Sequence, residues 1–408
     1  MERDELSAWL RLTLTPGVGN QSSRKLLAAF GSPESVFKQP LAALGHVVSQ
    51  AQAIALQQVP TELANLLEVT CKWLDSPETH RVVTLGDSNY PAGLLNIEDP
   101  PIMLYLLTSP RPLGRNFFSQ GVQRSVAIVG SRMSTPQGLS TAHQFGKALC
   151  EAGMTVISGM AQGIDAAAHE GAIQGAIQGA KEPATMAAAS SPSTDFLATI
   201  AVVGTGLDRV YPSSHRALAH AIAQHGMIVS EYPLGTPPLA ANFPKRNRII
   251  AGLAQGTLVV EAALKSGSLI TARMASEQGR EVFAIPGSIH SAYSRGCHAL
   301  IRQGAKLVET VEDILEELEP QFGSDALSSE PGKLSSRRAA MAQPTLSDEL
   351  DDDDALLQAL GFDPVSLDAL QARTGLDTPS LQAQLMTLEL DGRIARLPGG
   401  LFQRMGAA

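Results

Sequence analysis

The sequence predicts an α/β fold, an extended Rossmann-like, doubly wound and mostly parallel sheet, flanked by an N-terminal small helical domain and a C-terminal winged helix. Between residues 81 and 318, short Val- and Ile-rich runs alternate with Ala-rich stretches of helical pattern. This alternation is typical of parallel strands covered by helices on both faces. Most of these runs end near Gly, Pro or Ser, as strands do before ligand-facing loops. The expected strands are SVAIVG, MTVISG, TIAVVG, MIVSEY, TLVVEA, EVFAIPG and KLVE.

The first segment, residues 1–75, has a helical pattern throughout. In PGVGNQSSRKLL, Gly17 and Gly19 precede a helix, as in SAM or helix-hairpin-helix domains whose turn offers backbone N–H groups to a DNA phosphate. Glycines at a turn between two helices also serve plain geometry. Both interpretations of this turn stay open.

Three further boundaries follow from composition. Residues of about 172–198, with an AIQG doublet and an Ala/Ser/Pro-rich stretch, are expected to be a flexible surface insertion. Residues 319–354 end in the acidic run DELDDDD and are expected to be a solvated linker. Residues 355–408 have the pattern of three helices and a two-strand wing, which predicts a winged helix.

The bulk composition limits the classes of function. The formal net charge is -9 and the pI is about 5.5, which excludes a protein that coats nucleic acid through overall positive charge. Any DNA site must therefore be local. The start MERDELSAWLRL has no apolar signal segment, and no stretch reaches membrane-span length, so a cytoplasmic protein without membrane association is expected. Cys71, Cys150 and Cys297 are scattered, which predicts neither disulfides nor a thiolate metal site.

The first motif is AIVGSRMSTPQG, a strand that runs into Gly130, Ser131 and Arg132. Ser134 and Thr135 are candidate N-caps of the following helix, and unpaired N–H groups at that helix start would donate to a phosphate beside the Arg132 guanidinium. An ordinary strand-to-helix turn is the alternative. The segment lacks the GxGxxG pattern of dinucleotide sites, so no NAD or FAD, and no other cofactor, is expected.

The second motif is VISGMAQGIDAAAH, in which Gly159 and Gly163 allow close backbone approach. Asp165 is expected to cap the helix that begins DAAAH. Asp165 and His169 stand four residues apart, the spacing of a catalytic or metal pair, but no third ligand accompanies them. We therefore expect both side chains to be structural.

The third motif, NFPKRNR, is the densest basic cluster of the central domain: Lys245, Arg246 and Arg248 surround Asn247, next to Phe243. Cations at a helix start oppose the helix dipole unless an anion is present. This mismatch favours contact with a sugar-phosphate backbone, while Phe243 could stack on a base or pack internally.

The fourth motif is TLVVEAALKSGSLITA. Hydroxyls and N–H groups of Ser266, Gly267 and Ser268 could complete a track of phosphate contacts. Glu261, at the end of the expected strand, could instead be catalytic.

These blocks occur in a characteristic order. IVGSR, ISGMAQGIDAAAH, VVGTGLDRVYP, SEYPLGTPP, FPKRNRIIAGL, VVEAALKSGSLITA, GREVFAIPG and GCHALIRQGA resemble the signature blocks of the DNA-processing protein A (DprA/Smf) family. The resemblance implies a homodimeric, non-enzymatic protein that binds single-stranded DNA, protects incoming DNA and loads RecA recombinase during natural transformation. It also implies DNA contacts by Gly130, Ser131 and Arg132 and by Lys245, Arg246 and Arg248.

An enzyme is the competing hypothesis. AQGTLVVEA partly resembles the motif of lysine-decarboxylase-like proteins that hydrolyse nucleoside monophosphates, with Gly256, Thr257 and Glu261 in place, but the PGG portion is missing. The winged helix has four Arg and no Lys against five acids. We expect it to contact proteins or regulate rather than to bind DNA strongly.

Overall fold

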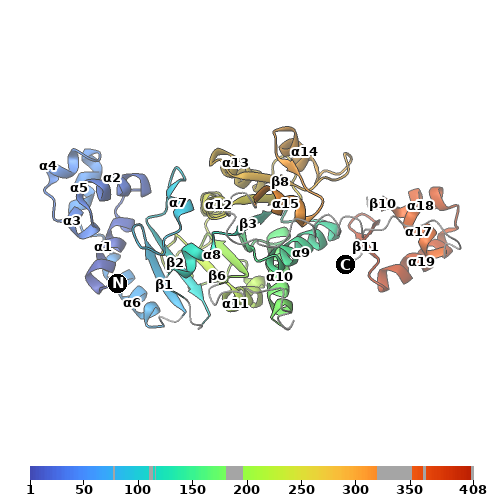
Figure 1. The fold of residues 1–408 in the computed structure, drawn as a ribbon, viewed down its shortest axis with the longest axis horizontal. Coiled ribbons are helices and arrows are strands. Elements are labelled where there is room, and N and C mark those ends of the chain that lie inside the picture. Colours follow the sequence, from blue (N-terminus) through green and yellow to red (C-terminus); the bar gives the residue numbers. More distant parts are fainter. Residues whose placement is uncertain are drawn as a thin grey trace, which may run out of the picture.

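The computed structural model describes residues 1–76, 79–109, 114, 116–180, 196–318, 352–361 and 364–405. A nine-stranded sheet forms the central domain. A helical unit precedes it in the sequence, and a winged helix comes after it (Figure 1). The mostly parallel α/β sheet and the winged helix confirm the expected fold class. Among the described residues, no helix has the length and apolar character needed to cross a membrane.

The sheet has the order β1-β2-β6-β5-β4-β3-β7-β8-β9. Its parallel strands are β3 (Ser125–Val129), β4 (Thr155–Ser158), β5 (Thr199–Val203), β6 (Met227–Ser230), β7 (Gly256–Val259), β8 (Glu281–Ala284) and β9 (Lys306–Leu307). The chain builds outward from β3 to β6 and then returns to place β7 beside β3. Strand order therefore reverses between β3 and β7, the point at which doubly wound sheets bind ligands.

Two antiparallel edge strands were not expected. β1 (His80–Thr84) pairs with β2 (Met103–Thr108), and β2 joins the edge of the parallel sheet through β6. The segment MLYLLT of β2 is buried at five of its six positions, so it shows no alternation of apolar and polar residues. A short apolar run of this kind does not distinguish a strand from a helix.

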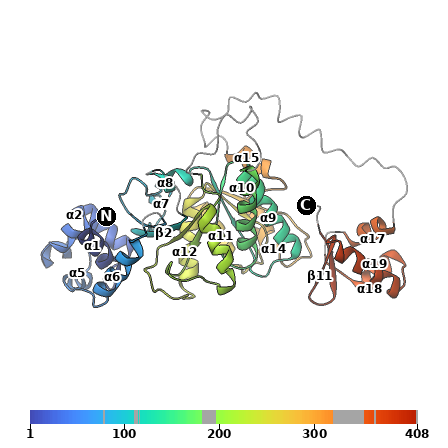
Figure 2. The ribbon, with the colours of Figure 1, turned by 90° about the horizontal axis from the view of Figure 1, so that it is seen from below.

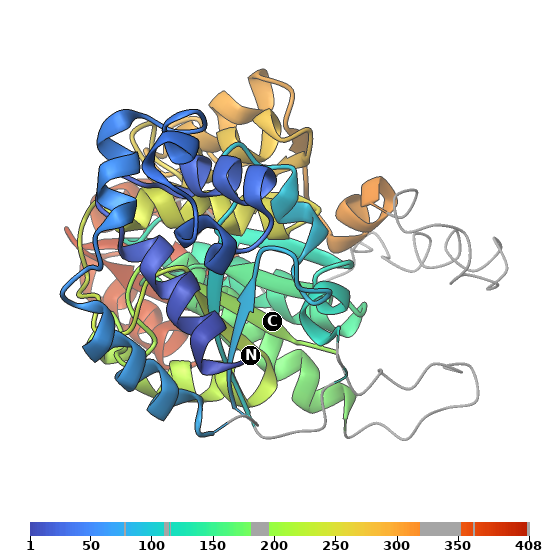
Figure 3. The ribbon, with the colours of Figure 1, turned by 90° about the vertical axis from the view of Figure 1, so that its left-hand side faces the viewer.

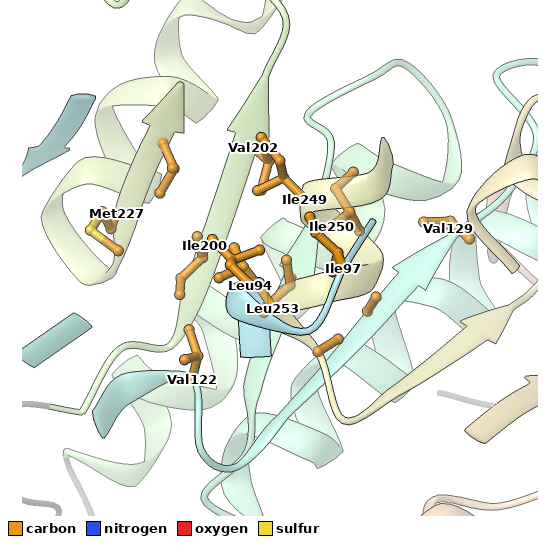
Figure 4. Packing of buried hydrophobic residues seen from close by; sticks show 14 of the residues in the cluster. Leu94, Ile97, Val122, Val129, Ile200, Val202, Met227, Ile249, Ile250 and Leu253 are labelled. Atoms are coloured by element: carbon orange, nitrogen blue, oxygen red, sulfur yellow. The ribbon is translucent and has the colours of Figure 1, made fainter. Parts of the chain in front are cut away.

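Helices cover both faces of the sheet and exclude water from the strands. One face packs against α7 (Ala92–Leu95), α8 (Phe117–Gly121), α12 (Asn242–Leu253), α13 (Ser268–Glu277) and α14 (Arg295–Arg302). The other packs against α9 (Pro136–Glu151), α10 (Ile164–Gly179), α15 (Val311–Leu318) and α11 (Arg216–His225), which follows the 3₁₀ turn η1 (Ser213–His215). Figure 4 shows Ile200 and Val202 of β5 packed against Ile249 and Leu253 of α12.

The N-terminal unit packs onto the sheet edge. Its helices are α1 (Arg3–Leu14), α2 (Asn20–Phe30), α3 (Pro33–Phe37), α4 (Leu41–Gly45), α5 (Gln50–Gln57) and α6 (Leu63–Leu74). Their buried cluster, which contains Trp9 and Leu10, continues into Met103 and Tyr105 of β2. Figure 3 shows the N-terminal helices in front of the sheet from this side. The helical unit and the sheet therefore share one apolar interface.

The C-terminal residues form α17 (Asp352–Leu360), β10 (Val365–Ser366), α18 (Leu367–Thr374), α19 (Thr378–Leu390), β11 (Ile394–Leu397) and β12 (Leu401–Arg404). Three helices and the β11–β12 wing agree with the expectation, and the short β10 adds a third strand to the wing. Of the expected insertion, residues 172–179 belong to α10, while 181–195 lie outside the described residues. Most of the expected linker, residues 319–351, also lies outside them.

Helices α9 and α10 lie side by side (Figures 1 and 2) at a separation that only glycine permits. A Cβ atom at Gly171 would overlap the His143 carbonyl, and one at Gly146 would overlap the Ala168 carbonyl. A Cβ at Gly179, by contrast, would meet nothing within 4 Å.

We predict that Gly171→Ala lowers the free energy of unfolding by about 1–3 kcal/mol, because the helices must separate to admit a methyl group. Gly179→Ala, in the last turn of the same helix, is the matched control and should be neutral or slightly stabilising. Denaturant unfolding measures both. Equal effects of the two variants would contradict close packing at Gly171.

Candidate nucleic-acid interface

An open cavity of about 700 Å³ lies at the carboxyl ends of the strands, where strand order reverses. Its walls come from the β3–α9 loop, the start of α12 and the loop before α13. Eight predicted site residues line it: Gly130, Ser131, Arg132, Arg246, Asn247, Ser266, Gly267 and Ser268. The other four predicted residues, Gly159, Gly163, Lys245 and Arg248, do not line it.

One wall of the cavity combines a cation with aromatic rings. The Arg132 guanidinium carbon lies 5.8 Å from the centre of the Phe243 ring, and the Phe243 and Tyr211 rings lie 5.4 Å apart. Tyr211 is 47% exposed, and Arg132 is exposed as well. Lys265 adds a second exposed cation to the lining. The wall thus offers positive charge next to an accessible π-face.

Sequence reasoning missed Tyr211, Lys265 and Tyr293 as lining residues. The sequence could have indicated Lys265, because this residue directly precedes Ser266 in a loop already expected at the site. It could not have indicated Tyr211, since only the tertiary fold brings the Tyr211 ring to Phe243.

Arg246 lines the cavity, but its guanidinium is buried and hydrogen-bonded to backbone carbonyls. The side chain is 4% exposed, and its Nη1 donates to the Gly159 carbonyl at 2.6 Å and to the Val202 carbonyl. A Cβ atom at Gly159 would overlap this guanidinium, which explains the glycine. Arg246 therefore ties α12 to the ends of β4 and β5.

Asp165 does not cap α10, so that expectation was wrong. Its carboxylate accepts from the backbone N–H groups of Gly159 (3.2 Å) and Ala161 (3.3 Å) in the preceding loop. The helix instead follows Gly163 at φ 79°, where a Cβ atom would overlap the Ser131 carbonyl. Burial raises the pKa of Asp165, and the nearby Arg246 guanidinium opposes that rise. Asp165 thus shapes the loop and balances Arg246.

The start of α9 is already occupied by a carboxylate. Glu261 accepts from the Thr135 backbone N–H at 2.9 Å and from its hydroxyl at 2.6 Å, while Thr135 Oγ1 accepts from Gly138 N–H at 3.0 Å. The expectation of unpaired N–H groups for a phosphate at this helix start is therefore wrong for these groups. Burial raises the pKa of Glu261, and both Thr135 hydrogen bonds oppose that rise. Thr135 is the N-cap of α9, and Glu261 is hydrogen-bonded to this cap residue.

The other two cations of the basic cluster, Lys245 and Arg248, differ in exposure and in contacts. Lys245 is exposed outside the cavity lining. Arg248 is mostly buried, and its guanidinium contacts the carboxylates of Glu231 and Asp99. The three neighbouring cations thus have three distinct environments.

His169 is fully buried, and its Nδ1 lies 2.6 Å from the Thr199 hydroxyl oxygen. That hydroxyl donates its only proton to the Val156 carbonyl at 2.8 Å, so it can only accept from His169. The neutral His169 ring therefore carries its proton on Nδ1. Burial, with the nearby Arg246 and His215, lowers its pKa to about 3. The structure agrees with a structural His169 hydrogen-bonded in the core.

We predict that His169 makes the protein less stable as the pH falls. The unfolded chain binds this proton near pH 6.5 and the folded chain only near pH 3, so stability present above pH 6.5 is lost as the pH falls toward 3. At pH 5 the loss is about 2 kcal/mol. Denaturant unfolding at pH 7 and pH 5 should show this loss of unfolding free energy in the wild type and not in His169→Gln. His220→Gln, at an exposed histidine, should keep it, and equal pH slopes for all three proteins would refute the assignment.

These features define a Rossmann-like α/β protein with a cationic and aromatic cleft at its topological switch point. A family model described as DNA recombination-mediator protein A matches residues 81–319, and a DprA winged helix domain model matches residues 338–400. The chain belongs to the DprA/Smf family of DNA recombination-mediator proteins.

The similarity to known proteins extends beyond the central domain. Protein Smf of Escherichia coli K12 is 38% identical over 358 residues, which cover 87% of this chain and 86% of the relative. Protein Smf of Synechocystis is 32% identical over 424 residues, covering 99% and 100%. The crystal structure of DNA processing protein A from Streptococcus pneumoniae superposes with a TM-score of 0.60 at 33% identity, covering 78% of this chain and 98% of that one.

Proposed function

We propose that the cavity binds single-stranded DNA, and that this cytoplasmic protein protects incoming DNA and loads RecA during natural transformation. The observation that carries the DNA proposal is the wall formed by Arg132, Phe243 and Tyr211. The family description, a DNA recombination mediator, supports a role beside a recombinase. A homodimer is part of the same proposal, on the strength of the family resemblance.

The exposed Tyr211 ring and the partly buried Phe243 ring favour a single strand over a duplex. Bases of a single strand can present their faces for stacking, whereas a duplex stacks those faces on one another. The exposed Arg132 lies next to Phe243, and the exposed Lys265 lines the same cavity. Both can neutralise the phosphates of a strand whose bases contact Tyr211. Such contacts are independent of base sequence.

The geometry does not favour the nucleotide-processing enzyme. That hypothesis needs the Glu261 carboxylate to be available to a substrate, and both of its oxygens accept hydrogen bonds from Thr135. We therefore propose a binding protein without catalysis.

The DNA proposal is confined to the central domain. In a winged helix the second helix of the helix-turn-helix, here α19, normally enters the DNA groove. The sequence of α19 contains no Lys or Arg, and Met386 and Leu390 are exposed on it. This helix offers no positive charge to a phosphate, which supports a role of the winged helix other than strong DNA binding.

We predict that Arg132→Ala, in the cavity lining, and Lys245→Ala, exposed between the lining residues Pro244 and Arg246, each weaken binding to single-stranded oligonucleotides of any sequence. Each variant should reduce the slope of log affinity against log salt by about 1, because one phosphate contact releases about one counterion. Fluorescence anisotropy at several salt concentrations measures both quantities.

The matched control is Lys147→Ala. Lys147 lies near the far end of α9 and pairs with Glu151, so its loss should leave affinity and salt slope unchanged. Wild-type binding in both Arg132→Ala and Lys245→Ala would refute the proposed site.

A further inference from the structure

Arg248 is held by two carboxylates on the side of α12 that faces the N-terminal helices. Its Nη2 lies 2.5 and 2.6 Å from the two oxygens of Glu231, and its Nε lies 3.3 Å from Asp99 Oδ2. The side chains of Arg248 and Glu231 are only 13% and 14% exposed. One nitrogen of Arg248 thus contacts both Glu231 oxygens, at a depth where solvent screens the pair poorly.

The same two carboxylates bind the helical domain. Asn20, the first residue of α2, donates from Nδ2 to Glu231 Oε1 at 2.7 Å and to Asp99 Oδ2 at 3.3 Å. Asn20 directly follows the turn of Gly17 and Gly19, which resembled a phosphate-binding turn. In the structure, the side chain that directly follows this turn contacts carboxylates of the central domain.

We propose that Asn20, Asp99, Glu231 and Arg248 form a carboxylate latch, in which Glu231 is a positioning residue that ties the helical domain and helix α12 together. The proposal rests on the proposed DNA-binding function of the cavity. It gives Arg248 a role apart from the DNA contact that the sequence suggested, and it gives Asn20, which follows the Gly17–Gly19 turn, an intramolecular partner.

The latch acts on the cavity through α12. This helix carries Arg248 toward the latch and Asn247 toward the cavity, with Lys245 at the exposed start. Asn242, at its first turn, donates to the Gly204 carbonyl at 3.0 Å. Asn242 and Arg246 fix the start of the helix on the sheet, and Arg248 fixes the side that faces the N-terminal helices. Loss of the Arg248 contact leaves that side unfixed and displaces Asn247 in the cavity wall.

The decisive variant is Glu231→Gln in the full chain, because the two roles of Arg248 predict opposite signs. If Glu231 positions α12, affinity for an oligothymidine falls roughly threefold to tenfold and the salt slope stays the same, since no phosphate contact is lost. If Arg248 contacts phosphate, removing the competing Glu231 carboxylate frees a cation, and affinity rises or the salt slope steepens. The second result would overturn the proposal.

A double-variant cycle separates the latch from the cavity. Glu231→Gln combined with Arg248→Gln should bind DNA no more weakly than the worse single variant, because the two residues act through one contact. Glu231→Gln combined with Arg132→Ala is the control, whose effects should multiply and whose salt slope should fall by about 1. Multiplying effects in the Glu231/Arg248 pair would contradict the latch.

A measurement without DNA keeps the two proposals distinguishable. Glu231→Gln and Asn20→Ala should each raise the unfolding equilibrium constant, and the double variant should raise it by less than the product of the two. A full product would overturn the latch even if DNA binds as proposed. If no form of the protein bound DNA, the proposed function would fail, while this cycle would still decide the latch.

Discussion

The Arg246 guanidinium holds helix α12 against the sheet with almost no access to water. It donates to carbonyls of Gly159 and Val202 at the ends of neighbouring strands, and Asp165 lies close enough to balance its charge. A buried cation cannot leave such partners without a cost of several kcal/mol. The start of α12, and with it Phe243 beside Arg132, therefore keeps a fixed place next to the β3–α9 loop. The cavity walls depend on this contact.

The same anchoring explains how an acidic chain, with a net charge of -9, can present a local positive surface. The cations differ in burial. Arg246 is buried, Arg248 is mostly buried and paired with carboxylates, and Arg132, Lys245 and Lys265 are exposed. The positive end of the α9 dipole is neutralised internally by Glu261. Affinity for an anionic polymer would then depend on few side chains, placed by many internal contacts.

The inner parallel strands β3 to β7 were predictable from sequence because both faces of each are buried, which selects continuous Val and Ile runs such as SVAIV of β3. The cavity loops were predictable because they follow those strands at the switch point. The environment of Arg246 also left a signal: it shares a helical face with Ile249, Ile250 and Leu253, a spacing typical of a buried stripe. The partners of Arg248 and the approach of Tyr211 to Phe243 depend on tertiary structure, and no local pattern encodes them.

The central claim is that single-stranded DNA lies in this cavity with bases near its aromatic rings. Photocrosslinking of an oligonucleotide substituted with 5-iodouracil, followed by mass spectrometric mapping, tests this most directly, because the photoreactive base attaches to aromatic side chains that it contacts. The account predicts crosslinks at Tyr211 or Phe243, reduced by Arg132→Ala. Crosslinks that map to α19 or to the N-terminal helices, with none at the cavity, would contradict it.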